Sequence, residues 1–257
     1  MLNTQIPMKQ SGQGETLLVH SIFPTIQGEG IFAGEPCVFV RLGGCNLQCP
    51  ACDTEYTEGS TKVLLHTLLQ TIKTELTKIG TNAIQPLVVI TGGEPMRQSI
   101  GRLVAALNFD GIKVQIETNG TLFDETIDFS TGMVYVMCSP KTGAVNKKLQ
   151  PHITAYKYVG GCNEKDPDSF LNHLEAQGIK LEDHGLLEDG LPKQALGHTA
   201  KPHLARPHEG FTGKVYLQPI DRQNDELNLA HQATVVKACQ QYGYTLCLQI
   251  HKIINVA

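Results

Sequence analysis

Short runs of apolar and β-branched residues alternate along the chain with longer segments whose apolar residues recur at helical spacing. Runs typical of strands are 36–42, 86–90, 113–117, 133–138, 154–159, 214–218 and 245–250. Segments with helical spacing are 63–79, 99–107, 168–177 and 225–242. Strands that alternate with helices imply a parallel sheet with helices packed outside it. The pattern therefore predicts an α/β fold, either doubly wound or a full or partial β/α barrel.

One region interrupts this alternation. Residues 181–213 are rich in glycine, proline and histidine and show no clear period. A loop of this length in a compact domain is usually a lid, a partner contact or a disordered insertion. We therefore expect a single domain over residues 1–257 with an insertion at 181–213.

Composition and charge narrow the class of protein. Of the 257 residues, 41% are hydrophobic and 18% charged, as in an ordinary soluble globular protein, and the net charge of -4 disfavours a nonspecific nucleic-acid binder. The polar N-terminus does not resemble a signal peptide, and no run approaches the ~20 apolar residues of a membrane span. We expect a cytoplasmic protein without direct membrane or nucleic-acid contact. The eight cysteines then suggest metal or redox chemistry rather than disulfides.

Small and polar residues follow the C-terminal ends of six predicted strands. They are Gly43-Gly44 with a cysteine cluster, Thr91-Gly92-Gly93-Glu94-Pro95, Glu117-Thr118-Asn119-Gly120, Ser139-Pro140-Lys141, Gln218-Pro219-Ile220-Asp221 and Gln249-Ile250-His251-Lys252. Any one of these could be an ordinary turn or helix cap. Active sites of β/α barrels and open α/β sheets lie at this edge. Six such ends together therefore predict a ligand site.

The cysteine cluster CNLQCPACD (45–53) allows three interpretations. A structural zinc site wants four ligands, and no second C-x-x-C is present. A redox pair Cys49-Pro50-Ala51-Cys52 leaves Cys45 unexplained. The C-x3-C-x2-C spacing suits an iron–sulfur cubane held at three corners, with one iron open to a substrate or cofactor. The third interpretation is favoured over zinc.

With this triplet the sequence resembles the radical S-adenosylmethionine superfamily. There, three cysteines spaced as Cys45, Cys49 and Cys52 bind a [4Fe–4S] cluster whose open iron chelates S-adenosylmethionine. Gly92-Gly93-Glu94-Pro95 is similar to the segment that contacts the amino group of the cofactor's methionine. The superfamily often has an aromatic residue before the third cysteine, near the adenine, where this chain has Ala51. Contacts to adenine must then come from elsewhere.

Within that superfamily the chain resembles the 7-carboxy-7-deazaguanine synthase family. The resemblance rests on FPTIQGEG (23–30), Arg41, Cys52-Asp53-Thr54 and QIHK (249–252), and it runs from about residue 20 to the C-terminus, interrupted by 181–213. It implies a single-domain, partial (truncated) parallel β/α barrel of about six or seven strands. The implied reaction is radical-mediated contraction of 6-carboxy-5,6,7,8-tetrahydropterin to 7-carboxy-7-deazaguanine with loss of ammonia, in queuosine and deazapurine biosynthesis. It begins with removal of hydrogen from C6 of the pterin.

The resemblance also implies roles for individual residues, although each could be an ordinary structural residue. The positions that match substrate contacts are Gln27, Glu29, Arg41, Thr91 and His251. The positions that match S-adenosylmethionine contacts are Gly92, Gly93, Glu94, Thr118, Ser139, Lys141 and Gln218. Thr54 matches a threonine whose hydroxyl helps to hold Mg²⁺. The cluster and the cofactor, rather than a catalytic side chain, carry the chemistry.

The resemblance further implies a homodimer and an electron donor of the flavodoxin or ferredoxin type. Two alternatives remain at this stage. One is a radical S-adenosylmethionine activase that acts on a protein partner, which the pterin-type motifs disfavour. The other is a zinc-binding module without enzymatic activity, which would bind one zinc and no iron.

Overall fold

The computed structural model describes residues 4–50, 52, 54–80, 85–162, 189–194 and 203–256. The strands are β1 (Thr16–Ile26), β2 (Pro36–Leu42), β3 (Thr61–Leu64), β4 (Leu87–Gly92), β5 (Lys113–Thr118), β6 (Val134–Cys138), β7 (Ile153–Gly160), β8 (Lys214–Pro219) and β9 (Thr245–Leu246). The helices are α1 (Leu65–Leu76), α2 (Gly101–Phe109), α4 (Asp225–Tyr242) and α5 (Ile250–Ile253). Four 3-10 turns complete the described elements: η1 (Gly30–Phe32), η2 (Pro95–Arg97), η3 (Phe129–Thr131) and η4 (Gln150–His152).

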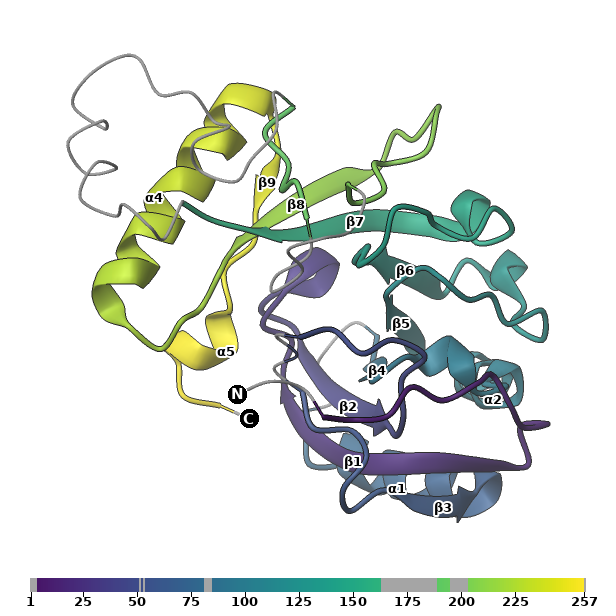
Figure 1. Cartoon of the computed structure of the whole chain (residues 1–257). Coiled ribbons are helices and arrows are strands. Elements are labelled where there is room, and N and C mark those ends of the chain that lie inside the picture. The colour runs from purple at the N-terminus through teal and green to yellow at the C-terminus, as the bar shows by residue number, and fades with distance from the viewer. Residues whose placement is uncertain are drawn as a thin grey trace, which may run out of the picture.

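All the described strands belong to one curved sheet (Figure 1). Its order is β3-β1-β2-β4-β5-β6-β7-β8-β9. From β2 to β9 every neighbouring pair is parallel, whereas β1 and β3 are antiparallel additions at one edge. The sheet is open, because β3 and β9 form its two edges. These seven parallel strands in an open, curved sheet confirm the predicted partial β/α barrel.

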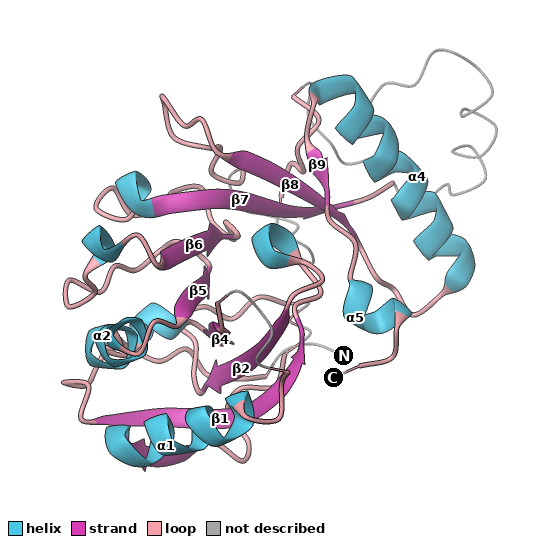
Figure 2. Ribbon diagram, turned by 180° about the vertical axis from the view of Figure 1, so that it is seen from behind, coloured by secondary structure: helices cyan, strands magenta, loops and turns pink. Residues whose placement is uncertain are grey.

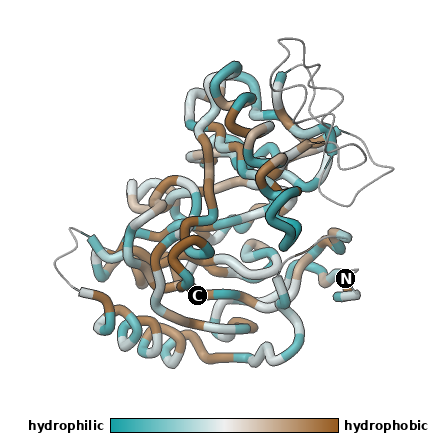
Figure 3. The backbone as a smooth tube through the Cα atoms, turned by 90° about the vertical axis from the view of Figure 1, so that its left-hand side faces the viewer, coloured by the Kyte–Doolittle hydropathy of each residue, from teal (hydrophilic) through white to brown (hydrophobic). Residues whose placement is uncertain are grey.

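Helices cover the outer side of this curved sheet (Figure 2). Helix α1 packs on β1 and β2, α2 on β5, and α4 on β8 and β9. The main core lies between these helices and the strands, where side chains such as Val40, Ile90 and Leu68 are fully buried. Figure 3 shows hydrophobic segments gathered in the interior and alternating with hydrophilic ones along the helices. Because the helices cover the outer side of the sheet, the loops that follow the strands at its C-terminal edge are available to form a site. Within the described residues, no helix is long and apolar enough to cross a membrane.

The structure corrects two of the predicted elements and adds strands that were not predicted. The strand predicted over 245–250 ends at Leu246, because the chain leaves the sheet and the Ile250 N–H donates to the Gly28 carbonyl at 3.1 Å. The helix predicted from residue 63 begins at Leu65, after the short edge strand β3. Strand β1 was not predicted, because its half-buried residues show no clear alternation. The helix predicted over 168–177 lies outside the described residues.

Parts of the predicted insertion 181–213 are described, and they pack on the main core. Leu191 and Leu204 are buried members of that core. Arg206 forms an ion pair with Asp189 at 2.6 Å. The Tyr158 hydroxyl on β7 donates to the Ala205 carbonyl at 2.7 Å. These two stretches, 189–194 and 203–213, are therefore anchored to the body of the sheet.

Candidate active site

The cysteine loop begins where β2 ends. The Gly44 N–H donates to the Tyr56 carbonyl at 2.8 Å and so ties the start of the loop to its return. The Cys45 thiol is buried, and its sulfur accepts a hydrogen bond from the Leu47 N–H at 3.4 Å. The Asn119 amide, from the end of β5, lies 3.9 Å from the same sulfur. Sulfur atoms that accept N–H donors in this way are typical of cluster ligands.

The environment of two of these thiols favours their neutral, protonated form. Burial raises the pKa of Cys45 to about 12. Burial also raises the pKa of Cys49, although the positive charge of Lys141 opposes the rise. Thiols bind metals as thiolates, and a bound metal supplies the charge that removes the proton. In the described part of the chain no three His, Cys, Asp or Glu side chains are grouped so that they could hold a metal ion without rearrangement.

The Gly-Gly-Glu-Pro segment after β4 packs directly on the cysteine loop. A Cβ atom at Gly93 would lie 2.3 Å from the Gly44 carbonyl oxygen, and one at Gly92 would lie 2.1 Å from the Leu42 carbonyl oxygen. Gly92 also has φ +136°, in the region that disfavours L side chains. The two glycines therefore allow β4 and the cysteine loop to touch backbone to backbone.

Glu94 links this segment to the end of β5 through hydrogen bonds. Its side chain is completely buried and accepts hydrogen bonds from the Thr118 hydroxyl at 2.7 Å, the Asn119 N–H at 2.7 Å and the Met96 N–H at 3.0 Å. Burial raises the pKa of Glu94 to about 7 against these three hydrogen bonds. Thr118 and Glu94, predicted separately, are thus brought into contact.

Three further residues predicted to contact S-adenosylmethionine lie at the C-terminal ends of β6 and β8. Lys141 donates to the Ser139 hydroxyl at 2.8 Å, just beyond β6. Gln218, near the end of β8, is buried, and its side-chain oxygen lies 3.8 Å from the Cys247 sulfur. The structure shows Lys141 near the cysteine loop, since its charge acts on Cys49. Their roles toward the cofactor stay predictions.

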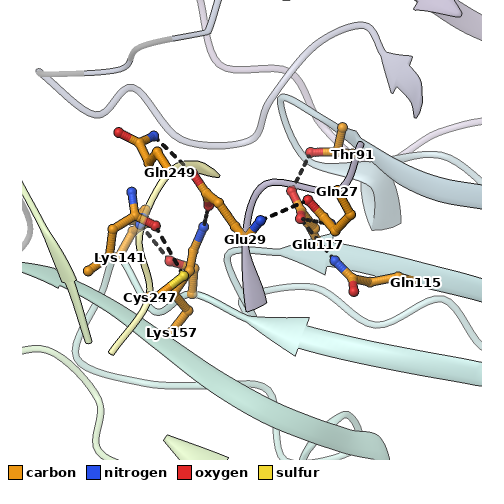
Figure 4. A network of polar contacts seen from close by, with 11 residues as sticks. Gln27, Glu29, Thr91, Gln115, Glu117, Lys141, Lys157, Cys247 and Gln249 are labelled. Carbon is orange, nitrogen blue, oxygen red and sulfur yellow. Dashed lines mark hydrogen bonds and ion pairs between the residues drawn. The ribbon is translucent and has the colours of Figure 1, made fainter. Parts of the chain in front are cut away.

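A second group of polar residues lies inside the sheet around Glu117 (Figure 4). Gln27 donates to one carboxylate oxygen of Glu117 at 3.2 Å, and Thr91 donates to the other at 3.1 Å. Gln115, two residues earlier on β5, also donates to Glu117 at 3.0 Å. Glu117 and Thr118 are consecutive and point to opposite sides of the strand, so β5 serves both groups.

Glu29 lies beside this group and links the turn after β1 to the C-terminal segment. It forms an ion pair with Lys157 of β7, and Gln249 donates to its other oxygen at 2.9 Å. His251 packs on the same turn, because a Cβ atom at Gly28 would lie 1.9 Å from its Nδ1. The QGEG and QIHK motifs, which are 220 residues apart at this hydrogen bond, therefore meet. We refer to Glu29, Lys157, Gln249 and His251 as the C-terminal clamp.

The remaining pair of predicted residues also meets. Arg41, on β2, donates from Nη1 to the Thr54 hydroxyl at 3.4 Å. Arg41, predicted to contact the substrate, and the Thr54 hydroxyl, predicted to help hold Mg²⁺, are therefore adjacent. Ala51 and Asp53 lie outside the described residues.

Sequence reasoning missed two of the charged residues in this site. Glu117 stands in a strand-end segment that was noted, but no role was assigned to it. Lys157 lies in the middle of β7 and was passed over as part of an ordinary strand. A lysine flanked by tyrosines within an apolar strand was a usable sequence feature, because lysine is rarely buried unless it is paired.

Both the sequence and the fold of this chain match known proteins. Residues 39–180, more than half of the chain, match the family described as the Radical SAM superfamily. The fold is similar to "Crystal structure of QueE from Escherichia coli", with a TM-score of 0.58, 22% sequence identity and coverage of 91% of this chain and 94% of that one. At this identity the likeness shows the fold alone. The chain is therefore a member of the radical S-adenosylmethionine superfamily.

Curated relatives resolve the family within that class. The chain is 38% identical over 254 residues to the 7-carboxy-7-deazaguanine synthase of Rhodospirillum rubrum, covering 96% of this chain and 95% of the relative. It is 35% identical over 252 residues to that of Rickettsia prowazekii, covering 96% and 91%. The chain belongs to the 7-carboxy-7-deazaguanine synthase family.

Proposed function

We propose that this chain converts 6-carboxy-5,6,7,8-tetrahydropterin into 7-carboxy-7-deazaguanine with release of ammonia, in deazapurine and queuosine biosynthesis. The observation that carries the proposal is the contact between Glu29 and Gln249. It joins the two motifs that distinguish this family from other radical S-adenosylmethionine enzymes, and it does so beside Lys157 of β7. The full-length match to relatives of that name supports it.

The residues of the cysteine loop fit a [4Fe–4S] cluster. They offer three sulfur donors on one loop, with N–H donors aimed at Cys45. Cys45, Cys49 and Cys52 would hold the cluster, which when reduced supplies the electron that cleaves S-adenosylmethionine to a carbon radical. Gly92 and Gly93 would present backbone to the cofactor, with Glu94 and Thr118 fixing their position. Ser139, Lys141 and Gln218 would contact the rest of it.

The second group and the C-terminal clamp would bind the substrate. Glu29 offers carboxylate oxygens to the donor groups of the guanidine-like pterin edge. Gln27 and Thr91 lie beside Glu117, and His251 covers the turn that carries Glu29. Arg41 can hold a carboxylate as a planar fork. These contacts would orient C6 of the pterin toward the cofactor.

Magnesium is part of the proposal. Thr54 supplies a hydroxyl oxygen, the donor type that Mg²⁺ prefers, and substrate and water oxygens would complete its shell. Arg41 next to Thr54 is positively charged, so we place the substrate carboxylate between the guanidinium and the metal. That placement explains why a cation and a metal ligand are neighbours.

Three further proposals follow from family membership. We propose a homodimer, and the exposed apolar residues Ile253, Ile254 and Val256 near the C-terminus are available for its interface. We propose a flavodoxin- or ferredoxin-type electron donor. We propose a cytoplasmic location, because thiolate cluster ligands need a compartment in which thiols stay reduced.

Anaerobic turnover tests the function. The reconstituted, dithionite-reduced protein is incubated with carboxytetrahydropterin, S-adenosylmethionine and Mg²⁺, and products are followed by mass spectrometry. We expect 7-carboxy-7-deazaguanine and ammonia. A preparation with a full complement of four iron atoms that cleaves S-adenosylmethionine but forms no deazaguanine would contradict the substrate assignment. A colourless protein with one zinc and no iron would contradict the class of chemistry.

A further inference from the structure

Lys157 is a largely buried cation for which the proposed reaction has no assigned role. It lies in the middle of β7, opposite Tyr216 of β8, and only 13% of its side chain is exposed. Its ammonium group contacts the carboxylate of Glu29, whose side chain is 14% exposed (Figure 4). Burying an ion pair costs desolvation of both charges, so such a pair in a binding site calls for a reason.

The charged and titratable groups around this pair come from four parts of the fold. Glu29 faces Lys157 of β7, Gln249 and His251. Lys157 faces Glu29, Glu117 of β5 and Cys247, which follows β9. Burial is the strongest influence and would raise the pKa of Glu29, but the charge of Lys157, the hydrogen bonds from Lys157 and Gln249 and the charge of His251 together lower it. The two carboxylates in turn raise the pKa of Lys157 well above its usual value, against the effect of burial.

The hydrogen bonds leave Glu29 with unused capacity. A carboxylate has about four acceptor positions, two on each oxygen. Lys157 occupies one position on Oε2, and Gln249 occupies one on Oε1. Within the described residues one position on each oxygen remains, which matches a ligand edge that presents two parallel N–H donors. The N3–H and 2-amino group of a pterin form such an edge.

We propose that Lys157 is a positioning residue for substrate recognition, which holds the Glu29 carboxylate charged and oriented so that both oxygens accept from the donor edge of a pterin. This inference rests on the proposed function and deepens it. Lys157 acts through Glu29 and does not itself contact the substrate. The ligand class that the pair selects is a heterocycle with an uncharged, planar edge that carries adjacent N–H donors.

Loss of the Lys157 charge has a consequence that depends on pH. Without it, burial dominates at Glu29, and only the Gln249 hydrogen bond and the more distant His251 favour the charged form. Glu29 then takes up a proton at higher pH than in the native protein. A protonated carboxyl group has one acceptor fewer and one donor more, so it clashes with the N–H edge. Binding therefore weakens as pH falls in the variant, by about tenfold for each pH unit below the new pKa.

The test compares Lys157→Met with a matched control. Lys113→Met removes an ammonium group that is also 13% exposed and is ion-paired to Glu35 at 2.8 Å, outside the clamp. Cluster-loaded protein with S-adenosylmethionine and Mg²⁺ is titrated with 6-carboxypterin, a fluorescent pterin with the same edge, between pH 5.5 and 7.5. We expect K157M to lose affinity progressively as pH falls, while the wild-type protein and K113M give parallel profiles. Thermal unfolding and iron content confirm that each variant is folded and loaded.

A double-mutant cycle separates an indirect role from direct contact. We expect Lys157→Met to weaken binding in the native background and to have little further effect when Glu29→Gln is already present. Glu29→Gln also removes the buried unpaired charge, so the double variant provides a folded protein if K157M alone is unstable. An equal loss in both backgrounds would show that Lys157 contacts the ligand itself and would overturn the inference.

The outcomes also distinguish this inference from the function beneath it. A K157M profile parallel to the wild type, whether weakened or not, would overturn the role of Lys157 while wild-type turnover upholds the proposed function. A wild-type protein that neither binds 6-carboxypterin nor forms deazaguanine would overturn the proposed function, and the role of Lys157 in it.

Discussion

Two glutamates, one at each side of the candidate active site, are held in opposite ways. Glu94, beneath the cysteine loop, receives three hydrogen bonds from uncharged donors, and burial raises its pKa to about 7. Glu29, in the C-terminal clamp, is paired with the Lys157 ammonium group, which lowers its pKa despite burial. Burial acts in the same direction on both, so the partner decides the outcome.

The difference corresponds to two tasks. Near the cysteine loop, backbone packing and neutral hydrogen bonds hold together Gly92, Gly93, Glu94 and Thr118, which we call the cradle. The buried carboxyl group of Glu94 can hold a proton there and then adds no fixed charge. In the clamp, a fixed negative charge must face a ligand with N–H donors. The cradle is therefore expected to fail by losing cofactors, whereas the clamp is expected to fail by losing substrate affinity. The following variants test that separation.

The largest effect is expected from Cys45→Ala, which removes the most buried sulfur of the triplet. Two thiols cannot replace three around a cubane, so we expect loss of the brown cluster absorbance and of all product. Cys239→Ala, at a buried position on α4 far along the chain, is the control and should keep both. Full iron content in C45A would show that the loop does not hold the cluster.

Gly93→Ala should damage the cradle almost as severely. The new Cβ atom would lie 2.3 Å from the Gly44 carbonyl, and backbone on both sides leaves little room to adjust. We expect loss of most of the bound iron and of S-adenosylmethionine binding. Iron content and calorimetric cofactor binding measure this. Retention of both, with a defect confined to pterin affinity, would erase the distinction between cradle and clamp.

Gly28→Ala is the corresponding change in the clamp. Its Cβ atom would lie 1.9 Å from Nδ1 of His251, so the C-terminal segment must move. We expect a KM for the pterin raised about tenfold or more, roughly 1.4 kcal/mol, with the cluster intact. Gly80→Ala, which has open space around the new methyl group, is the matched control. Loss of iron in G28A would contradict the separation.

Thr54→Ala tests the junction between the two sides. Removal of the hydroxyl takes away the proposed magnesium ligand and the acceptor for Arg41. We expect the cluster to remain and the stimulation by Mg²⁺ to disappear, whereas Thr54→Ser should restore it. Rates measured with Mg²⁺ and with a chelator decide the matter. An unchanged dependence on Mg²⁺ in T54A would remove Thr54 from the metal site.

The remaining effect is expected on the stability of the fold rather than on activity, and it depends on pH. Because the pKa of Glu94 is raised from 4.5 to about 7, its stabilising contribution is complete below about pH 4.5 and is lost as pH rises through 7. For Glu29 the sign is opposite, since a lowered pKa gives stability that is lost on acidification. Denaturant unfolding of wild type, Glu94→Gln and Glu29→Gln should diverge with pH in these directions, by at most about 3.4 kcal/mol for Glu94. The same slope in both variants would contradict the contrast.

The cradle was largely predictable from the sequence, and the clamp only in part. Cysteine spacing, the glycines after β4 and the strand-end position of Thr118 are local features, and strand ends of a parallel sheet meet at one edge. The seven parallel strands followed from the same periodicity. Strand β1 escaped prediction because its residues are half-buried and lack alternation.

The clamp depends on contacts that no local pattern encodes. Gln249 reaches Glu29 only because the chain leaves the sheet after Leu246, where alternation predicted a longer strand. Lys157 looked like a strand residue, and its burial is possible only because Glu29 and Glu117 come from distant elements to meet it. Charge pairing of this kind is a tertiary property, so the sequence indicated the motifs but not their partner.

The most direct test of the central claim, radical contraction of a pterin ring, follows the hydrogen at C6. Carboxytetrahydropterin deuterated at C6 is turned over by the reduced, cluster-loaded protein, and the adenosyl compounds and the product are analysed by mass spectrometry. We predict deuterium in the adenosyl carbon of S-adenosylmethionine or its cleavage product, together with 7-carboxy-7-deazaguanine. Deuterium found only in solvent, or deazaguanine formed without S-adenosylmethionine, would contradict that claim.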